Sequence, residues 1–223
     1  RDLYKKNIIM IGVDEAGRGS WAGPLVATSC WFDFSKYKSL HSKINDSKKL
    51  RSINRREIIL SLKNFVKYSS AIASVKEIDN YGLTYANSIA MKRSLFSVVQ
   101  SLKNHEIYKN KQLCIYIDGK HIPDFYNLDK FLKDKELKFK YCSVKTLIKG
   151  DSLSKTIALA SIISKETRDS IMRKLSLQHP FYSFENHFGY GTVNHKNAIL
   201  KNGLLEFHRK SFKPIATIYS KNK

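Results

Sequence analysis

The 223-residue sequence is poor in acidic residues, and this shortage restricts the kind of partner that we expect. It contains 19 Asp and Glu against 40 Lys and Arg, which gives a formal net charge of +21. A Lys-rich composition that only keeps the protein in solution explains part of this charge, but a polyanionic partner explains it better. A membrane surface is one polyanion, yet the sequence has no long apolar run, lipidation motif or basic amphipathic helix. Nucleic acid is therefore the expected partner, with no membrane contact.

Cysteine is also scarce, and no flexible linker divides the chain. Cys30, Cys114 and Cys142 are far apart, and each lies in an apolar, strand-like run. This spacing favours free thiols in a reducing compartment over disulfides or a zinc site. Because no signal peptide precedes Arg1, we expect a cytoplasmic protein. Without a Pro-, Gly- or Ser-rich linker, we expect one domain over residues 1–223 and a monomer.

The most informative stretch is IIMIGVDEAGRGSWAGP, from Ile8 to Pro24. Its apolar, partly β-branched start predicts a buried strand that ends in two adjacent acids, Asp14 and Glu15. Side chains alternate along a strand, so the two carboxylates cannot both enter the same core. Because an unpaired buried carboxylate is unfavourable, this acidic pair at a strand end indicates a bound cation.

Glycine follows the acidic pair directly. Gly17, Arg18 and Gly19 permit a tight turn and a close approach of the backbone to a ligand such as a sugar-phosphate. Together with Ala22 they also match the G-x-G-x-x-G/A pattern of dinucleotide-binding proteins. That alternative is disfavoured because the next segment, Leu25–Phe32, predicts a strand rather than a helix, and the acids would repel a pyrophosphate.

Two further acids lie at the ends of predicted elements. Asp118 ends the apolar run LCIYI and precedes a glycine, and Asp151 precedes a helix predicted from Ser152 onward. Each has a structural explanation, because Asp-Gly is a common turn and a helix start favours a carboxylate. Small residues along one face of this helix would let it lie close to the sheet, which would place Asp151 near the other strand ends.

Two adjacent lysines are candidates for contacts with a phosphate backbone. Lys48 and Lys49 lie in a polar loop before a helix predicted over residues 52–65, with Ser52 as its N-cap. Adjacent lysines are usually part of a solvated face. Near a metal-binding strand end they are also placed to bind phosphate, so both interpretations stay open.

Three helical or loop residues complete the candidate contacts. Asn87 lies in the first turn of an amphipathic helix predicted over residues 85–102 and is either a near-cap residue or a phosphate contact. Lys165 would contact a bound phosphate or pair with an acid. Tyr190, between two glycines, is placed to stack on a base or sugar. Asp169, at the far end of its helix, is expected to form a structural salt bridge or cap.

Six motifs in order give the sequence a family resemblance that extends from about Ile8 to Phe212. They are IGVDEAGRGSWAGPLV, DSKKL, IDG, KGDSLSKTIALASIISKETRD, HFGYGT and HRKSF. In this order they resemble the type 2 ribonucleases H, specifically ribonuclease HII. The resemblance implies an α/β, ribonuclease H-like fold, with a mixed central β-sheet flanked by α-helices. It also implies a C-terminal helical extension, about residues 176–223, that completes the substrate cleft.

The resemblance assigns metal binding and catalysis to Asp14, Glu15, Asp118 and Asp151. Four carboxylates form an all-oxygen cluster that suits Mg²⁺ or Mn²⁺ and not zinc. Two such ions, about 3.5 to 4 Å apart, would activate a water and stabilise the leaving 3′-oxygen. The cofactors expected are therefore two divalent ions per site.

The resemblance also implies how the substrate is recognised. The turn Gly17-Arg18-Gly19 corresponds to the family's reader of the ribonucleotide 2′-hydroxyl, and Tyr190 works with it at the RNA to DNA junction. We therefore expect an endonuclease that cleaves the RNA strand of RNA/DNA hybrids and nicks DNA on the 5′ side of embedded ribonucleotides, leaving 3′-hydroxyl and 5′-phosphate ends. Two alternatives stay open: a resolvase or other metal-dependent nuclease of the same fold, and a non-catalytic basic module that binds nucleic acid. The stretch between Asp118 and Asp151 is longer than the resemblance leads us to expect for bacterial members, and the charged segment 121–138 within it has no assigned chemistry.

Overall fold

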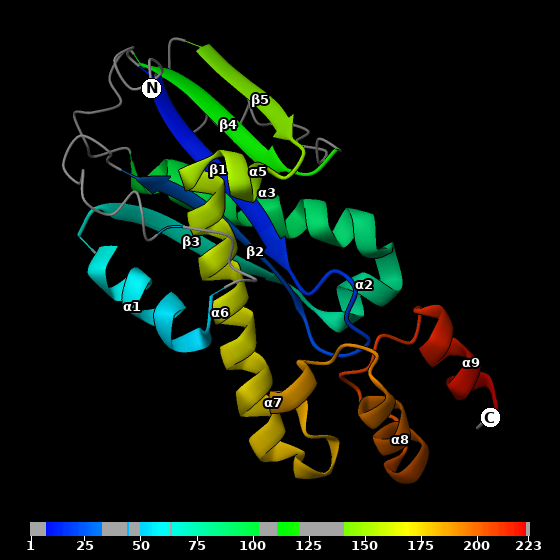
Figure 1. Cartoon of the computed structure of the whole chain (residues 1–223). Coiled ribbons are helices and arrows are strands. Elements are labelled where there is room, and N and C mark those ends of the chain that lie inside the picture. Colours follow the sequence, from blue (N-terminus) through cyan, green and yellow to red (C-terminus); the bar gives the residue numbers. More distant parts are fainter. Residues whose placement is uncertain are drawn as a thin grey trace.

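The computed structural model describes residues 8–32, 44, 50–62, 64–102, 111–120 and 141–221, except the side chains of residues 141, 142, 219 and 221. Within these ranges a mixed sheet lies between two layers of helices, and short C-terminal helices extend beyond it (Figure 1). The α/β class predicted from the sequence is confirmed. The segment 121–138 and the lysine pair Lys48 and Lys49 lie outside the described residues.

The sheet has five strands in the order β3-β2-β1-β4-β5, so the strand that carries the acidic pair is central. β1 pairs antiparallel with β2, the strand predicted over Leu25–Phe32, and parallel with β4, which pairs parallel with β5. No helix separates β1 from β2, so the rejection of a dinucleotide-binding unit is confirmed. The strands are β1 Ile8–Ala16, β2 Leu25–Phe32, β3 Val66–Ala73, β4 Gln112–Asp118 and β5 Tyr141–Leu147.

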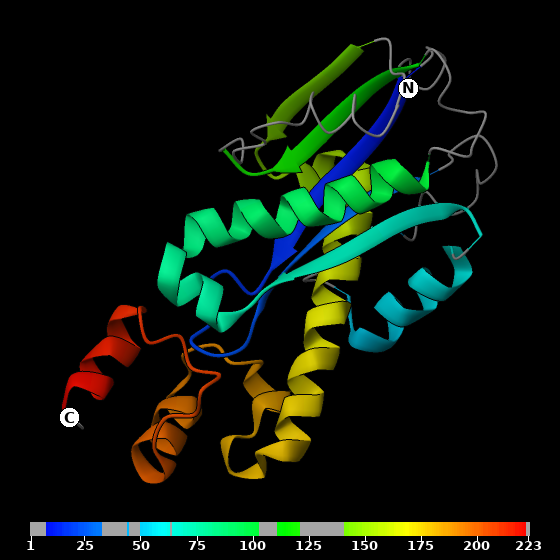
Figure 2. The same ribbon diagram turned by 180° about the vertical axis from the view of Figure 1, so that it is seen from behind.

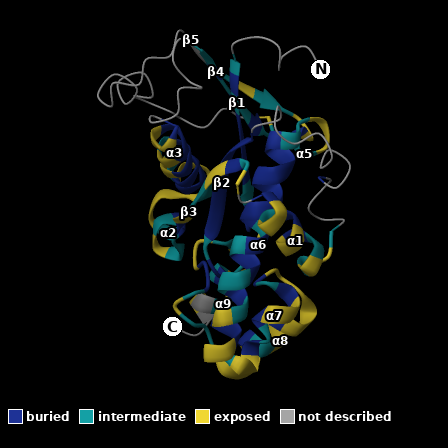
Figure 3. Ribbon diagram, turned by 90° about the vertical axis from the view of Figure 1, so that its left-hand side faces the viewer, coloured by how far each residue is buried: buried dark blue, intermediate teal, exposed yellow. Residues whose placement is uncertain are grey.

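Helices cover both faces of the sheet. α6 and α1 lie on the face seen in Figure 1, and α3 and α2 lie on the opposite face, seen in Figure 2. Figure 3 shows buried residues concentrated between α3 and α6. The helices are α1 Ser52–Leu62, α2 Val75–Tyr81, α3 Leu83–Ser101, α5 Gly150–Leu153, α6 Lys155–Gln178, η5 Pro180–Tyr182 (a 3₁₀ turn), α7 Phe184–His187, α8 Val193–Asn202 and α9 Lys213–Lys221.

The first turns of α6 lie directly on β1, as the small residues of this helix predicted. At Gly12, in the middle of β1, an added Cβ would be 2.3 Å from the carbonyl carbon of Thr156 and 2.4 Å from the nitrogen of Ile157. The absence of a side chain at Gly12 therefore permits this close approach. It brings the start of α6 to within two residues of Asp14 along β1.

Two local predictions about helix ends are wrong. Ser52 is the first residue of α1 rather than its N-cap, and its hydroxyl donates to Glu166 at 2.9 Å instead of accepting from the helix. The helix predicted from Ser152 onward is broken at Ser154, which has an extended conformation (φ −122°, ψ 123°) and separates α5 from α6. The first difference comes from a tertiary contact, with Glu166, that local sequence does not encode.

The C-terminal extension has its own apolar cluster beyond the carboxyl end of β1. Tyr182, Phe184, Ile199 and Ile215 pack there with Met172 of α6. Figure 1 shows α7, α8 and α9 grouped at this end of the molecule. The extension is thereby joined to both α6 and the loop after β1.

Two of the three cysteines lie in the described residues with their side chains, and neither forms a disulfide there. Cys30 is buried and Cys114 is partly buried, and both are free thiols. Burial raises the pKa of the Cys30 thiol, as expected for an inert core residue. No helix in the described ranges is long and apolar enough to cross a membrane.

Candidate active site

The acidic pair lies where β1 leaves the sheet beside β4. The register pairs Val13 of β1 with Ile117 of β4, so the next residues, Asp14 and Asp118, are adjacent at the same edge of the sheet. The strands are parallel, and their carboxyl ends therefore meet at one place. The parallel pairing of β1 with β4 thus gathers two acids that are 104 positions apart in the sequence.

Asp14 is the buried member of the pair, with 6% of its surface exposed. The backbone N–H of Glu15 donates to its Oδ1 at 2.7 Å. Burial is the largest cause of a raised pKa at Asp14, and the negative charges of Glu15 and Asp118 raise it further, while a hydrogen bond from Ser161 opposes the rise. A carboxylate in these surroundings is stabilised by a bound proton or by a cation.

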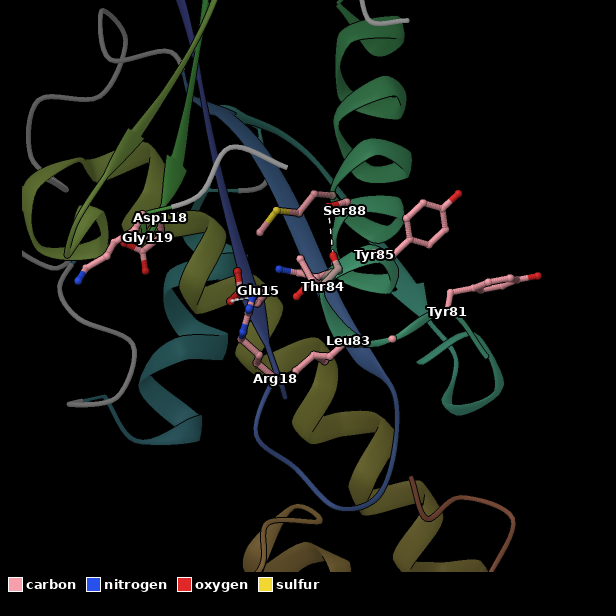
Figure 4. Close-up of a pocket in the computed structure, with 13 residues that line it drawn as sticks. Glu15, Arg18, Tyr81, Leu83, Thr84, Tyr85, Ser88, Asp118 and Gly119 are labelled. Carbon is pink, nitrogen blue, oxygen red and sulfur yellow. Dashed lines mark hydrogen bonds and ion pairs between the residues drawn. The ribbon is translucent and has the colours of Figure 1, made fainter. Parts of the chain in front are cut away.

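Glu15 is only partly buried. Its side chain lies on the opposite face of the strand from that of Asp14, as the alternation of side chains predicted. One of its carboxylate oxygens lies 3.9 Å from Nη1 of Arg18, whose side chain is about half exposed. Figure 4 shows Glu15 and Arg18 turned toward each other, with Asp118 on the neighbouring strand. This exposed ion pair is weak, so Glu15 can exchange Arg18 for another cation.

Asp118 forms a hydrogen bond with the residue that precedes Asp151. The backbone N–H of Gly150 donates to Oδ1 of Asp118 at 2.7 Å. A Cβ on Gly150 would be 2.6 Å from Cδ1 of Ile157 and 3.3 Å from Oδ1 of Asp118, so the glycine is closely packed at this contact. Asp151 follows at once in the first turn of α5. The prediction that Asp151 lies near the strand ends is therefore supported by the bond between Asp118 and Gly150.

The donor chemistry of the four acids fits a divalent cation that prefers oxygen. Carboxylates are hard ligands suited to Mg²⁺ or Mn²⁺, and burial among like charges makes a cation favourable beside Asp14. Among the described residues, however, no three His, Cys, Asp or Glu side chains are close enough together to hold a metal ion. Ligation therefore requires the acidic side chains to converge on the groove that they border.

A groove of about 980 Å³ opens beside the acids, between the ends of β1 and β4 and the first turns of α3. Figure 4 shows side chains from all three elements directed into it. α3 begins without a side-chain cap and without an acid in its first turn, so its N-terminal N–H groups favour a negatively charged ligand. The lining residues are Glu15, Arg18, Tyr81, Gly82, Leu83, Thr84, Tyr85, Asn87, Ser88, Met91, Asp118, Gly119 and Lys120.

The glycine turn after β1 has the conformation that its sequence predicts. Gly17 has φ +89°, and a Cβ there would lie 2.0 Å from Nε of Arg168, so both conformation and space require glycine. Arg18 and Gly19 are exposed. The turn therefore presents its middle residues to solvent while Gly17 packs inward.

Tyr190 lies beside this turn, as expected if the two act together. A Cβ on Gly19 would be 4.0 Å from Cε1 of the Tyr190 ring, which is 40% exposed. The carbonyl oxygen of Gly189 accepts hydrogen bonds from the backbone N–H groups of Trp21, at 2.8 Å, and Ala22, at 3.2 Å. The loop that carries Tyr190 is thus fixed to the loop that carries the glycines.

The remaining predicted contacts differ in their surroundings. Asn87 lines the groove, is 6% exposed, and its Oδ1 has no hydrogen-bond partner among the described residues. Lys165 forms an ion pair with Asp169 and lies 4.4 Å from the centre of the Phe188 ring. For Lys165 the structure thus shows the ion pair, which was one of the two predicted alternatives. Asp169 also pairs with Arg55 at 2.7 Å, so its predicted structural salt bridge is confirmed.

Two residues next to the site were not singled out by sequence reasoning. Arg168 and Arg209 are almost fully buried, at 1% and 0% exposure, and their guanidinium groups contact the loop after β1. Arginine is rarely buried without a carboxylate, and nothing in the local sequence distinguishes these two from the other basic residues. Sequence reasoning also did not single out the groove residues Thr84, Ser88 and Lys120, because no local sequence pattern distinguishes them from other polar residues.

A comparison with models of protein families shows the family to which the chain belongs. The family model described as Ribonuclease HII matches residues 11–215. The chain belongs to the ribonuclease HII family. A curated ribonuclease HII from Fusobacterium nucleatum is 41% identical over 213 residues, covering 95% of this chain and 87% of the relative.

Solved structures share the fold of this chain. The ribonuclease H2 of Pyrococcus horikoshii OT3 superposes with a TM-score of 0.68 at 24% identity, covering 96% of this chain and 98% of that one. Bst-RNase HIII in complex with Mn²⁺ gives a TM-score of 0.68 at 20% identity, covering 98% and 71%. The ribonuclease H-like fold predicted from the sequence is therefore confirmed. Membership of the ribonuclease HII family also makes this protein a ribonuclease H, which is a hydrolase of phosphodiester bonds.

Proposed function

We propose that this ribonuclease HII is an endonuclease that cleaves the RNA strand of RNA/DNA hybrids and nicks duplex DNA on the 5′ side of embedded ribonucleotides. The observation that carries the proposal is the buried Asp14, whose pKa is raised beside Glu15 and Asp118 at the edge of a groove. Three carboxylates there would repel a phosphodiester unless divalent cations lay between them and the substrate. The products proposed are 3′-hydroxyl and 5′-phosphate ends.

Asp14, Glu15, Asp118 and Asp151 are the proposed ligands of two divalent ions, Mg²⁺ or Mn²⁺. When bound, such ions acidify a water and stabilise the charge on the leaving oxygen. The protein's part is to hold the acids: Ser161 and the N–H of Glu15 orient Asp14, and the N–H of Gly150 orients Asp118.

Recognition of the ribonucleotide is proposed for the turn Gly17-Arg18-Gly19 and for Tyr190. The exposure of Gly19 and its proximity to the Tyr190 ring support this assignment, because backbone groups there can approach a sugar closely. The 2′-hydroxyl is the group that separates RNA from DNA at such a position. Tyr190 would stack on the sugar or base next to the junction.

Backbone contacts that do not depend on sequence are proposed for the groove and for the basic residues around it. Asn87 offers a polar side chain in the groove, and Lys48, Lys49 and Lys165 remain candidate phosphate contacts. The monomeric state, the cytoplasmic location and the closing of the substrate cleft by residues 176–223 stay predictions.

The test is cleavage of two end-labelled DNA duplexes of identical sequence, one of which carries a single ribonucleotide. With Mg²⁺ or Mn²⁺ we expect one nick 5′ of the ribonucleotide, ends that a 3′-hydroxyl-dependent polymerase extends, and no cleavage with EDTA. Equal cleavage of both duplexes would replace the proposal with a general nuclease or resolvase. Binding of both without cleavage would leave a nucleic-acid-binding module.

A further inference from the structure

Two arginines are buried behind the loop after β1, and no carboxylate in the described part of the chain forms an ion pair with them. Arg168, from α6, and Arg209, from the segment before α9, are 1% and 0% exposed. Within the described residues, neither forms a salt bridge with a carboxylate, and backbone carbonyl oxygens accept their hydrogen bonds instead. A buried charge is unfavourable unless it is well satisfied, so these contacts need a structural reason.

Arg209 holds the loop at its two ends. Its Nε and Nη2 donate to the carbonyl oxygen of Gly23 at 3.0 and 2.9 Å, and its Nη1 donates to the carbonyl oxygen of Arg18 at 3.1 Å. In a trans peptide the C=O and the following N–H point in opposite directions. Because the Arg18 carbonyl points inward to Arg209, the N–H of Gly19 points away from it, toward the exposed side of the turn.

Arg168 joins the same loop to the loop of Tyr190. It donates to the carbonyl oxygens of Pro24 at 2.9 Å, Ala22 at 3.1 Å and Phe188 at 2.9 Å. Its Cζ lies 5.6 Å from the centre of the Tyr190 ring. One planar guanidinium group therefore fixes three carbonyls and supports the ring of Tyr190.

We propose that Arg168 and Arg209 are positioning residues for recognition of the 2′-hydroxyl, because they fix the Arg18–Gly19 peptide and the Tyr190 ring in one arrangement. This inference rests on the proposed function, in which that turn and Tyr190 contact the ribonucleotide. The Arg209 guanidinium stays protonated at neutral pH, since burial lowers its pKa only to about 9. Lysine at either position keeps the charge but cannot hold several carbonyls at fixed angles.

The experiment compares two substrates that differ only in the 2′ group of one nucleotide. One DNA duplex carries a single ribonucleotide, and the other carries a 2′-fluoro nucleotide at the same position. The measured quantity is the ratio of kcat/KM for the first to kcat/KM for the second. For R168K and R209K we expect this ratio to fall at least about tenfold from that of the wild type, with KM for the ribonucleotide substrate raised. R209M should lower the ratio further than R209K.

The matched control is R55K, because Arg55 is another buried arginine, 5% exposed, that contacts Glu166 and Asp169 rather than the loop. We expect R55K to lower the melting temperature while leaving the ratio within about twofold of the wild type. An unchanged ratio in folded R168K and R209K would overturn the inference, and if R209M fails to fold, the two lysine variants still decide. If the wild type itself does not prefer the 2′-hydroxyl, the proposed function fails instead.

Discussion

Replacing Gly12 by alanine tests how the fold brings the acids together. Gly12 lies in the middle of β1, where α6 crosses the strand. An alanine Cβ would be 2.3 Å from the carbonyl carbon of Thr156 and 2.4 Å from the nitrogen of Ile157. Both of these atoms belong to the backbone, so no side-chain rotation relieves the overlap. The start of α6 must therefore move away from β1 by about 1 Å to reach ordinary contact.

The size of the effect follows from that displacement. Overpacking costs typically about 1 to 3 kcal/mol, and we expect the upper end because the helix backbone must shift. For a domain of this length, about 3 kcal/mol corresponds to a fall in melting temperature of about 6 to 12 °C. Asp151 lies just before this helix, so the shift also displaces one acid of the cluster. A misplacement of about 1 Å reduces catalysis about 100-fold.

Thermal unfolding by circular dichroism and cleavage of the single-ribonucleotide duplex measure the two effects separately. The matched control is Gly203→Ala, because Gly203 also has a glycine-type conformation (φ +84°) but no atom within 4 Å of the added Cβ. It should lose only about 1 to 2 kcal/mol and keep full activity. If Gly12→Ala were as stable and as active as the wild type, the close approach of α6 to β1 would not organise the site.

Three other predictions concern separate parts of the molecule. Burial lowers the pKa of His195 and His208 to about 4, so the unfolded chain takes up protons below pH 6.5 while the folded chain does not. The free energy of unfolding should therefore fall by about 1.4 kcal/mol per pH unit for each histidine between pH 6.5 and about 4. Urea titrations at several pH values measure this free energy, and it should fall less steeply with decreasing pH in His195→Gln than in the wild type. Glu166→Gln should lower the stability by about 3 kcal/mol in denaturant unfolding, because Glu166 accepts from Arg55 and two other arginines; an unchanged midpoint would contradict this. Tyr190→Ala should reduce cleavage at a single ribonucleotide about tenfold or more, whereas Tyr190→Phe should keep the part due to stacking; equal rates for both would exclude a stacking role.

Local sequence predicts those parts of the site that depend on periodicity and on backbone conformation. Alternation along β1 correctly predicts that Asp14 and Glu15 do not both enter the same core, and the glycine pattern predicts the turn at Gly17. The small residues of α6 predict its close packing on β1. These features depend on residues within one element, so a pattern over a few positions is sufficient.

Contacts between distant segments are not predictable in this way. The hydroxyl of Ser52 binds Glu166, 114 positions away, and this partner replaces the helix cap that the local pattern favours. Arg168 and Arg209 donate to carbonyls 144 and 186 positions away. In the sequence they are indistinguishable from the many surface lysines and arginines, because only the folded chain determines which cations are buried.

The most direct test of the account is the effect of Asp118→Asn on cleavage of the duplex with one ribonucleotide, beside Glu206→Gln. Both changes remove one negative charge, but Asp118 borders the groove with the other acids, whereas Glu206 is exposed in the C-terminal extension. We expect Asp118→Asn to reduce kcat at least about 1,000-fold while its melting temperature stays near that of the wild type. Glu206→Gln should cleave at the wild-type rate. A fully active Asp118→Asn enzyme would contradict the assignment of catalysis to the acids at the ends of β1 and β4.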